Sequence, residues 1–138
     1  MNYKILSKFI KDISFEIPSA QAFTMLEKEI QNYNLNFDIT SQKFKEKIIE
    51  VNVVLKIIPG MNVKNKILAE INLAALVSIE NAKDKKELER IILINVPNEV
   101  YPSLYETFVY LFKQAGIKNI EINKKVDFKK LYEERNKS

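Results

Sequence analysis

Residues 12–17 alternate strictly between polar and apolar side chains, and this alternation constrains the fold more than any other feature of the sequence. Successive side chains of a β-strand point to opposite faces, so the segment is expected to be a strand with one buried face and one solvent face. The buried face should consist of Ile13, Phe15 and Ile17. The solvent face, a first candidate for a partner site, should consist of Asp12, Ser14 and Glu16. Pro18 has no amide hydrogen to donate, so the strand should end there.

Three further segments have the same period of two and predict three more strands, over residues 33–40, 48–58 and 64–79. A polar stretch over residues 41–47 and the Pro59-Gly60 pair supply the turns between them. Four strands joined by short turns favour an antiparallel sheet with one covered face. The side chains expected on that covered face are Tyr33, Leu35, Phe37, Ile39, Ile49, Val51, Val53, Leu55, Ile57, Ile67, Ala69, Ile71 and Leu73. The side chains of the last strand expected on the other face are Leu68, Glu70 and Asn72.

The second half of the chain should supply the helices that cover the sheet. Residues 91–96 could be a strand or a buried helix, and the context favours a helix with a kink or a break at Pro97-Asn98. A clear helix follows, with Pro102 in its first turn and Gly116 as its left-handed cap. Its apolar stripe is wider than one sheet face needs, so the helix is either deeply buried or also packs on another subunit. The residues of that stripe are Tyr101, Leu104, Tyr105, Phe108, Val109, Leu111, Phe112 and Ala115.

Two shorter helices are expected elsewhere. Ser19 can cap a helical segment that runs to about residue 32, and Asp127 can cap a last helix near the end of the chain. The last helix is too short to be stable by itself, so it must dock on the rest of the protein. Its apolar face consists of Phe128, Leu131 and Tyr132. The chain is therefore predicted to be one α+β domain over residues 1–138, with a four-stranded antiparallel sheet and helices packed on one face.

The residue types that the chain lacks exclude several kinds of chemistry. The chain has no Cys, His or Trp and only 2 Gly in 138 residues. Thiol catalysis, imidazole base catalysis, zinc sites built on Cys or His, and Gly-rich phosphate loops are therefore excluded. We expect no enzyme activity, no cofactor and no metal site.

The charge of the chain is modest. It has 22 Lys and Arg against 18 Asp and Glu, a formal net charge of +4. One dense group of basic residues occurs near the C-terminal end of the sequence. A solvated surface explains this group, so no nucleic-acid partner is expected. This group consists of Lys124, Lys125, Lys129 and Lys130. With no run of about 18 apolar residues and no signal-peptide pattern at the N-terminus, we expect a cytoplasmic protein that does not insert into membranes.

Asp12 and Glu16 could instead form a catalytic carboxylate pair. Four strand residues separate their Cα atoms by about 13 Å, whereas glycosidase carboxylates lie about 5–9.5 Å apart. An open strand face also lacks an enclosing pocket. Docking of a partner by surface charge is the better interpretation, and ordinary solvated acids remain the alternative.

Three blocks of the sequence together resemble the SecB family of export chaperones. They are KDISFEIP at residues 11–18, VPNEVYPSLYETF at residues 96–108 and VDFKKLYEER at residues 126–135. The resemblance implies the four-stranded sheet with helices on one face, assembled as a dimer of dimers. It also implies an ATP-independent holdase that binds unfolded preproteins in apolar grooves and delivers them to the translocase ATPase SecA.

The resemblance assigns three sets of candidate residues. The set implied for SecA docking is Asp12, Glu16, Leu68 and Glu70. The set implied for client binding is Ile30, Leu35, Phe37, Phe128, Leu131 and Tyr132, with Ile30, Leu131 and Tyr132 expected to be exposed. The set implied for the subunit interface is Tyr101, Leu104, Tyr105, Phe108, Val109 and Phe112.

The chain departs from the family pattern at several points. Ala74-Ala75 replace the usual glycine pair, Tyr105 stands in place of an arginine, and the charge is mildly basic where the family is acidic. A SecB-like chaperone dedicated to one client, such as an antitoxin, is therefore the nearest alternative. An oligomeric scaffold without a client is the alternative outside the chaperone class.

Overall fold

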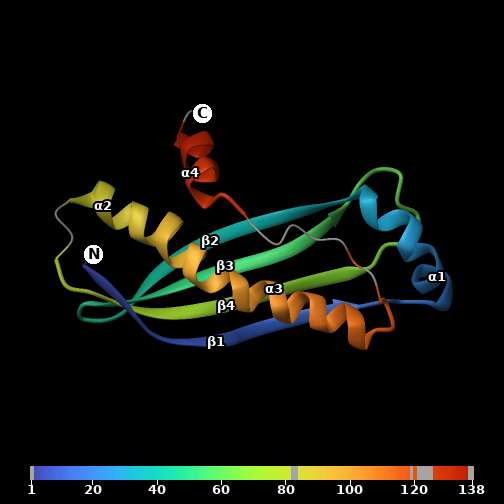
Figure 1. Cartoon of the computed structure of the whole chain (residues 1–138), viewed down its shortest axis with the longest axis horizontal. Helices are drawn as coiled ribbons and strands as arrows, with labels where there is room; N and C mark the ends of the chain where they lie inside the picture. The colour runs from blue at the N-terminus through green and yellow to red at the C-terminus, as the bar shows by residue number, and fades with distance from the viewer. Residues whose placement is uncertain (1, 82–83, 119, 121–125, 137–138) are drawn as a thin grey trace.

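The structure, a computed structural model, describes residues 2–81, 84–118, 120 and 126–136. Four antiparallel strands form one sheet in the spatial order β1-β4-β3-β2, so that β1 and β2 are its edges (Figure 1). The strands are β1 (Tyr3–Glu16), β2 (Tyr33–Lys45), β3 (Ile48–Pro59) and β4 (Leu68–Ile79). The helical elements are α1 (Ala20–Glu29), the 3-10 turn η1 (Ile30–Asn32), α2 (Lys85–Arg90), the π-helical turn η2 (Ile91–Asn95), α3 (Val96–Gln114) and α4 (Phe128–Asn136). The predicted fold class is confirmed.

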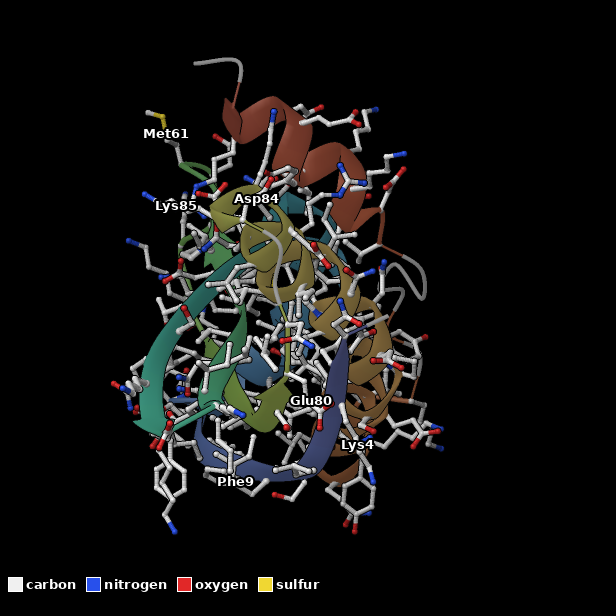
Figure 2. All side chains as sticks on the ribbon, turned by 90° about the vertical axis from the view of Figure 1, so that its left-hand side faces the viewer. Lys4, Phe9, Met61, Glu80, Asp84 and Lys85 are labelled. Atoms are coloured by element: carbon white, nitrogen blue, oxygen red, sulfur yellow. The ribbon has the colours of Figure 1, made fainter. Side chains whose placement is uncertain are left out.

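The long helices cover one face of the sheet, which we call the inner face. α2, η2 and α3 follow one another along the chain and lie across the strands (Figure 1). Figure 2, viewed from the end that carries Lys4 and Glu80, shows these helices on one side of the sheet and Phe9 on the other, the outer face. Phe108 and Phe112 of α3 are completely buried against the inner face. The core therefore lies between α3 and the alternate side chains of the strands that point toward it.

β1 contains two β-bulges, which conceal its alternation in the sequence before Asp12. Its pairing with β4 shifts register between Ile5 and Ser7 and again between Ile10 and Asp12. From Asp12 onward the pairing is regular, and Asp12 and Glu16 lie on the outer face as predicted. A bulge adds one residue to one strand, so the period of two is interrupted wherever it occurs.

The inner face of β1 is less buried than the alternation predicts. Phe15 packs edge-on against Phe112 of α3, with ring centroids 5.1 Å apart. Ile13 lies opposite Ile71 on the same face, yet it is 40% exposed. Ile13 therefore lies on the predicted face of the edge strand β1 but is not part of the buried core.

Of the kink or break predicted at Pro97-Asn98, the break does not occur, and the helical path is irregular in the turn just before Pro97. The backbone N–H of Val96 donates to the carbonyl of Ile91, five residues earlier, which is the hydrogen bond of a π turn. Such a turn is wider than an α-helical turn and makes room for the proline ring, which has no N–H to satisfy. α3 consequently begins at Val96, and Pro102 lies inside the helix and not in its first turn.

The predicted helix caps are confirmed. The Ser19 hydroxyl oxygen accepts a hydrogen bond from the Ala22 N–H at 3.0 Å and starts α1. The Asp127 carboxylate accepts one from the Lys130 N–H at 3.0 Å at the start of α4. Gly116 has a φ of 98° and follows α3 as the left-handed residue. These local signals fix where three of the helices begin or end.

Gly60 ties the β3–β4 connection to η1. Its N–H donates to the Asn32 carbonyl at 2.8 Å, and a Cβ at this position would lie 2.7 Å from the same oxygen. Only glycine permits this approach of two backbones. The contact holds the end of β3 next to the start of β2, so the sequence expectation of a plain turn understated its role.

Candidate functional site

Three adjoining cavities follow the edge strand β2 on its inner side and form one groove between β2, η2 and α4. Their volumes are about 280, 300 and 360 Å³. Neighbouring cavities share lining residues, so they are continuous. We call this feature the β2 groove. Its lining residues include Leu35, Phe37, Ile39, Leu93, Phe128, Leu131, Tyr132 and Arg135.

The floor of the β2 groove is a cluster of aromatic rings. Phe37 of β2 contacts Phe128 of α4 and Tyr101 of α3, each with ring centroids 5.6 Å apart. Tyr101 and Phe128 complete the cluster at 5.9 Å. Burial, and secondarily the neighbouring Tyr105, raises the pKa of Tyr101 to about 12. Phe37 and Phe128 line the groove and present apolar surface, as expected of a site that binds apolar side chains, while Tyr101 packs against both rings. The lining also includes the charged residues Asp38, Glu89, Asp127, Lys130, Glu134 and Arg135.

α4 is docked above this floor by two further contacts. The buried ring of Phe128 anchors its first turn, and the Tyr132 hydroxyl donates to a carboxylate oxygen of Glu89 at 3.2 Å. Between them Leu131 is 42% exposed and lines the groove. A helix of this length needs such docking to be stable. The result is an exposed apolar side chain held on a fixed helix beside an open strand edge.

The structure brings together most of the client-binding residues expected from the sequence. Leu35, Phe37, Phe128, Leu131 and Tyr132 all line the β2 groove. Ile30, in η1, is half-buried and is not among the lining residues of these cavities. Tyr132 is 7% exposed and therefore buried to a greater extent than expected.

The sequence interpretation missed the contribution of η2 to the groove. Leu93 lines two of the three cavities and Ile92 lines one. Their segment was expected to be a plain buried helix. The apolar run at residues 91–96 was the available signal, but its π turn, which decides the direction of these side chains, has no recognisable sequence pattern.

The outer face carries the four residues expected to dock a partner. Glu16 lies directly opposite Leu68, and Ser14 lies directly opposite Glu70 in the pairing of β1 with β4. Leu68 is 47% exposed. The Ser14 hydroxyl donates to the Asp12 carboxylate at 3.2 Å. Glu16 and Glu70 thus flank exposed Leu68, and Asp12 lies further along β1, opposite Asn72. Acids and an apolar side chain on one face suit a partner with basic and apolar side chains.

This face is not uniformly acidic. Lys56 of β3 lies directly opposite Glu70, and Lys11 lies in the β1 bulge beside Asp12. The arrangement of these two lysines sets how much negative charge the face presents.

A buried polar network occupies the middle of the outer face. Glu50 of β3 is only 8% exposed. One of its carboxylate oxygens accepts from the Lys11 ammonium group at 2.5 Å and from the Asn52 amide at 2.9 Å. The hydrogen bond from Lys11 is the main reason that the pKa of Glu50 is lowered, with the bond from Asn52 next and burial acting in the opposite direction. Glu50 is therefore ionised at neutral pH in spite of its burial.

Four of the six residues expected at the subunit interface belong to the core of the chain itself. Tyr101, Leu104, Phe108 and Phe112 are between 0 and 3% exposed, so they cannot provide contact area to another subunit. Burial within the chain therefore accounts for these four residues of the stripe on α3, as the first of the two sequence alternatives predicts. Tyr105 and Val109 are half-buried, and Tyr110 next to them is exposed.

Two other sequence expectations concern charge and membranes. Lys129 and Lys130 are exposed on α4, while Lys124 and Lys125 lie outside the described residues. Among the helices that the structure describes, none is long and apolar enough to cross a bilayer.

Comparison with known proteins places these features in a family. Residues 1–138 match the family model described as preprotein translocase subunit SecB. A SecB relative from Pelagibacter ubique is 41% identical over 135 residues, which is 97% of this chain and 96% of the relative. The protein-export protein SecB of Nitrosospira multiformis is 28% identical over 133 residues, which is 96% of this chain and 82% of the relative.

Among solved structures, the chain is similar to a Mycobacterium tuberculosis SecB-like chaperone that was determined in complex with a ChAD peptide from the HigA1 antitoxin. The TM-score is 0.69 at 14% sequence identity, covering 91% of this chain and 88% of that one. A protein of unknown function from Streptococcus agalactiae has a TM-score of 0.52 at 13% identity, covering 87% of this chain. At these identities the likeness concerns the fold.

Proposed function

Because the chain belongs to the SecB family of protein-export chaperones, we propose that it holds unfolded preproteins in the β2 groove without ATP and delivers them to SecA through its outer face. The observation that supports this most directly is the groove itself. An exposed leucine stands over a buried aromatic floor beside the free edge of β2. This arrangement can bury apolar side chains of many sequences without selecting one.

The client is an extended polypeptide. The groove follows β2 from Leu35 to Ser41, six residue steps or about 20 Å of extended chain. Apolar burial contributes about 25 cal/mol per Å², so a few anchoring side chains give weak, reversible binding at each site. Main-chain pairing with the edge of β2 adds affinity that does not depend on sequence.

SecA docks on the opposite side of the same sheet, on Asp12, Glu16, Leu68 and Glu70. Three of these side chains are acids, so the attraction is electrostatic and Leu68 supplies apolar contact. Since the groove lies on the inner side of β2 and the acids lie on the outer face of β1 and β4, the two partners do not compete for the same surface. Transfer can then begin while the client is still bound.

The assembly is a homotetramer, a dimer of dimers, in the cytoplasm. Tyr105 and Val109 of α3 are its interface candidates, together with exposed Tyr110. Static light scattering at micromolar concentration should give about four times the chain's 16.1 kDa. A species of the mass of one chain would contradict the assembly.

A reciprocal pair of substitutions tests the two sites against each other. Leu131 and Leu68 are the same residue type with similar exposure, 42 and 47%, in the groove and on the outer face respectively. Leu131→Gln should weaken suppression of the aggregation of a chemically unfolded protein and leave SecA binding unchanged. Leu68→Gln should do the reverse. Equal effects of the two substitutions on both measurements would contradict the division of the sites.

Charge reversal tests the docking site more severely. Asp12→Lys combined with Glu16→Lys should lower SecA affinity at least tenfold, because each change replaces attraction by repulsion. Glu46→Lys, an exposed acid at the β2–β3 turn, is the matched control and should change affinity little. Unchanged SecA binding in the double variant would show that Asp12 and Glu16 are solvated surface residues without a role in docking.

The breadth of client binding separates general export from service to one client. A general chaperone should suppress aggregation of several unrelated unfolded proteins at similar concentrations. Suppression limited to a single antitoxin would favour the dedicated SecB-like chaperone, and no suppression at all would favour a scaffold.

A further inference from the structure

The β1 bulge places two successive residues of opposite charge on the outer face. In a regular strand, neighbours in sequence point to opposite faces. The register shift between Ile10 and Asp12 leaves Lys11 without an opposite residue in β4. The Lys11 ammonium reaches Glu50 on the outer face, the face on which Asp12 also lies. The bulge therefore brings a cation next to an acid of the docking site.

Lys11 nevertheless points away from Asp12. Its ammonium group lies 2.5 Å from a carboxylate oxygen of Glu50, which belongs to β3, so the side chain must cross β4. Ala74 of β4 lies between Phe9 and Asn52 on the outer face and is completely buried, as expected if the Lys11 stem passes over it. A small side chain at this position permits the crossing.

The surface between Asp12 and Glu50 is lined with hydrogen-bond acceptors. Asn72 lies directly opposite Asp12, and Asn52 donates to Glu50. The side-chain oxygens of both asparagines are buried and have no hydrogen-bond partner among the described residues. An ammonium group can therefore be accommodated at either end of this path, beside Glu50 or beside Asp12.

We propose that Glu50 holds Lys11 away from Asp12 and thereby keeps the docking face acidic. This inference rests on the proposed docking of SecA. Glu50 is too deeply buried to contact a partner, so it acts as a positioning residue through Lys11. Without it, we expect Lys11 to pair with Asp12, its neighbour in the bulge on the same face, and this pair would cancel one of the three charges offered to a basic partner.

The test compares SecA binding by calorimetry across variants that differ in the position of Lys11. Glu50→Gln keeps the shape of the side chain and should lower SecA affinity about two- to fivefold, the range expected of an exposed ion pair. The double variant Lys11→Met with Glu50→Gln removes the cation and should restore affinity to the wild-type value or above. It also leaves no unpaired buried charge, so it remains informative if Glu50→Gln folds poorly. Client binding should be unchanged in both.

A crystal structure of the Glu50→Gln variant supplies a readout that does not involve SecA, with Lys11 Nζ expected within about 4 Å of the Asp12 carboxylate. Lys11 remaining over β4 in that structure would overturn the inference. Asp12→Asn distinguishes this failure from that of the docking proposal. Weaker binding in Asp12→Asn with unchanged binding in Glu50→Gln would overturn the role of Glu50 alone. Unchanged binding in both variants would overturn the role of Glu50 and the docking site together.

Discussion

The β2 groove and the outer acidic face lie on the same sheet but offer opposite chemistry. The groove presents Leu131 over buried aromatic rings. The outer face presents Asp12, Glu16 and Glu70 together with Leu68, and the Lys11 ammonium group on this face is paired with Glu50. Binding in the groove is favoured by the removal of apolar area from water, and binding on the outer face is favoured by electrostatic attraction. Conditions that weaken one mode of binding should therefore leave the other intact or strengthen it.

The largest effect is expected from a substitution that removes the groove and leaves the outer face in place. Phe128→Ala removes a buried ring that contacts Phe37 and Tyr101, and should cost about 3–5 kcal/mol of the free energy of unfolding. α4 should undock with it, so client binding should be lost while SecA binding persists. Urea denaturation and aggregation assays measure the two effects. Phe44→Ala, at the exposed end of β2, is the control and should change stability by less than about 0.5 kcal/mol.

Ionic strength should affect SecA binding and client binding differently. Raising ionic strength from about 0.05 to 0.5 M shortens the screening length several-fold, so SecA affinity should fall about tenfold. Client affinity should stay constant or rise, because burial of apolar area is not screened by ions. Titrations of each partner at both salt concentrations give the comparison. A parallel fall of both affinities would mean that the groove also binds by charge.

The stability contribution of the Glu50 network should depend on pH. The folded-state pKa of Glu50 is lowered from its ordinary value of 4.5, so its contribution to stability is present above that pH and is lost as pH falls through the folded pKa. At pH 6, Glu50→Gln should cost about 1–2 kcal/mol in urea unfolding, since it removes charge-assisted hydrogen bonds. At pH 3 the difference between the two proteins should shrink. A constant difference would indicate that the ion pair contributes nothing.

The smallest effect concerns the fine positioning of α4. Tyr132→Phe removes only the hydrogen bond from the hydroxyl to Glu89 and should cost about 0.5–1.5 kcal/mol. Client affinity should fall less than in Leu131→Gln, because the groove keeps its apolar lining. Thermal unfolding and peptide titration measure both quantities. A loss of client binding as large as that of Phe128→Ala would show that this single hydrogen bond holds the groove in place.

Local rules located part of each strand and three of the helix ends, whereas β1 begins earlier and β2 ends later than predicted. The period of two assigned Asp12, Glu16, Leu68 and Glu70 to one face, and the pairing of β1 with β4 confirms it. The Ser19 cap was found as well, because a side chain that bonds to a backbone a few residues away leaves a local pattern.

Long-range contacts decided what the sequence left open or gave incorrectly. The amino-acid sequence by itself determined the alternating faces, the caps and the chemistry that the missing residue types exclude. Only the tertiary structure decided that α3 buries Phe108 and Phe112 within the chain, that α4 meets β2 to form the groove, and that Lys11 crosses to Glu50. The physical reason is distance along the chain: Phe37 and Phe128, or Lys11 and Glu50, meet through packing and through a bulge, and neither leaves a period in the residues between them.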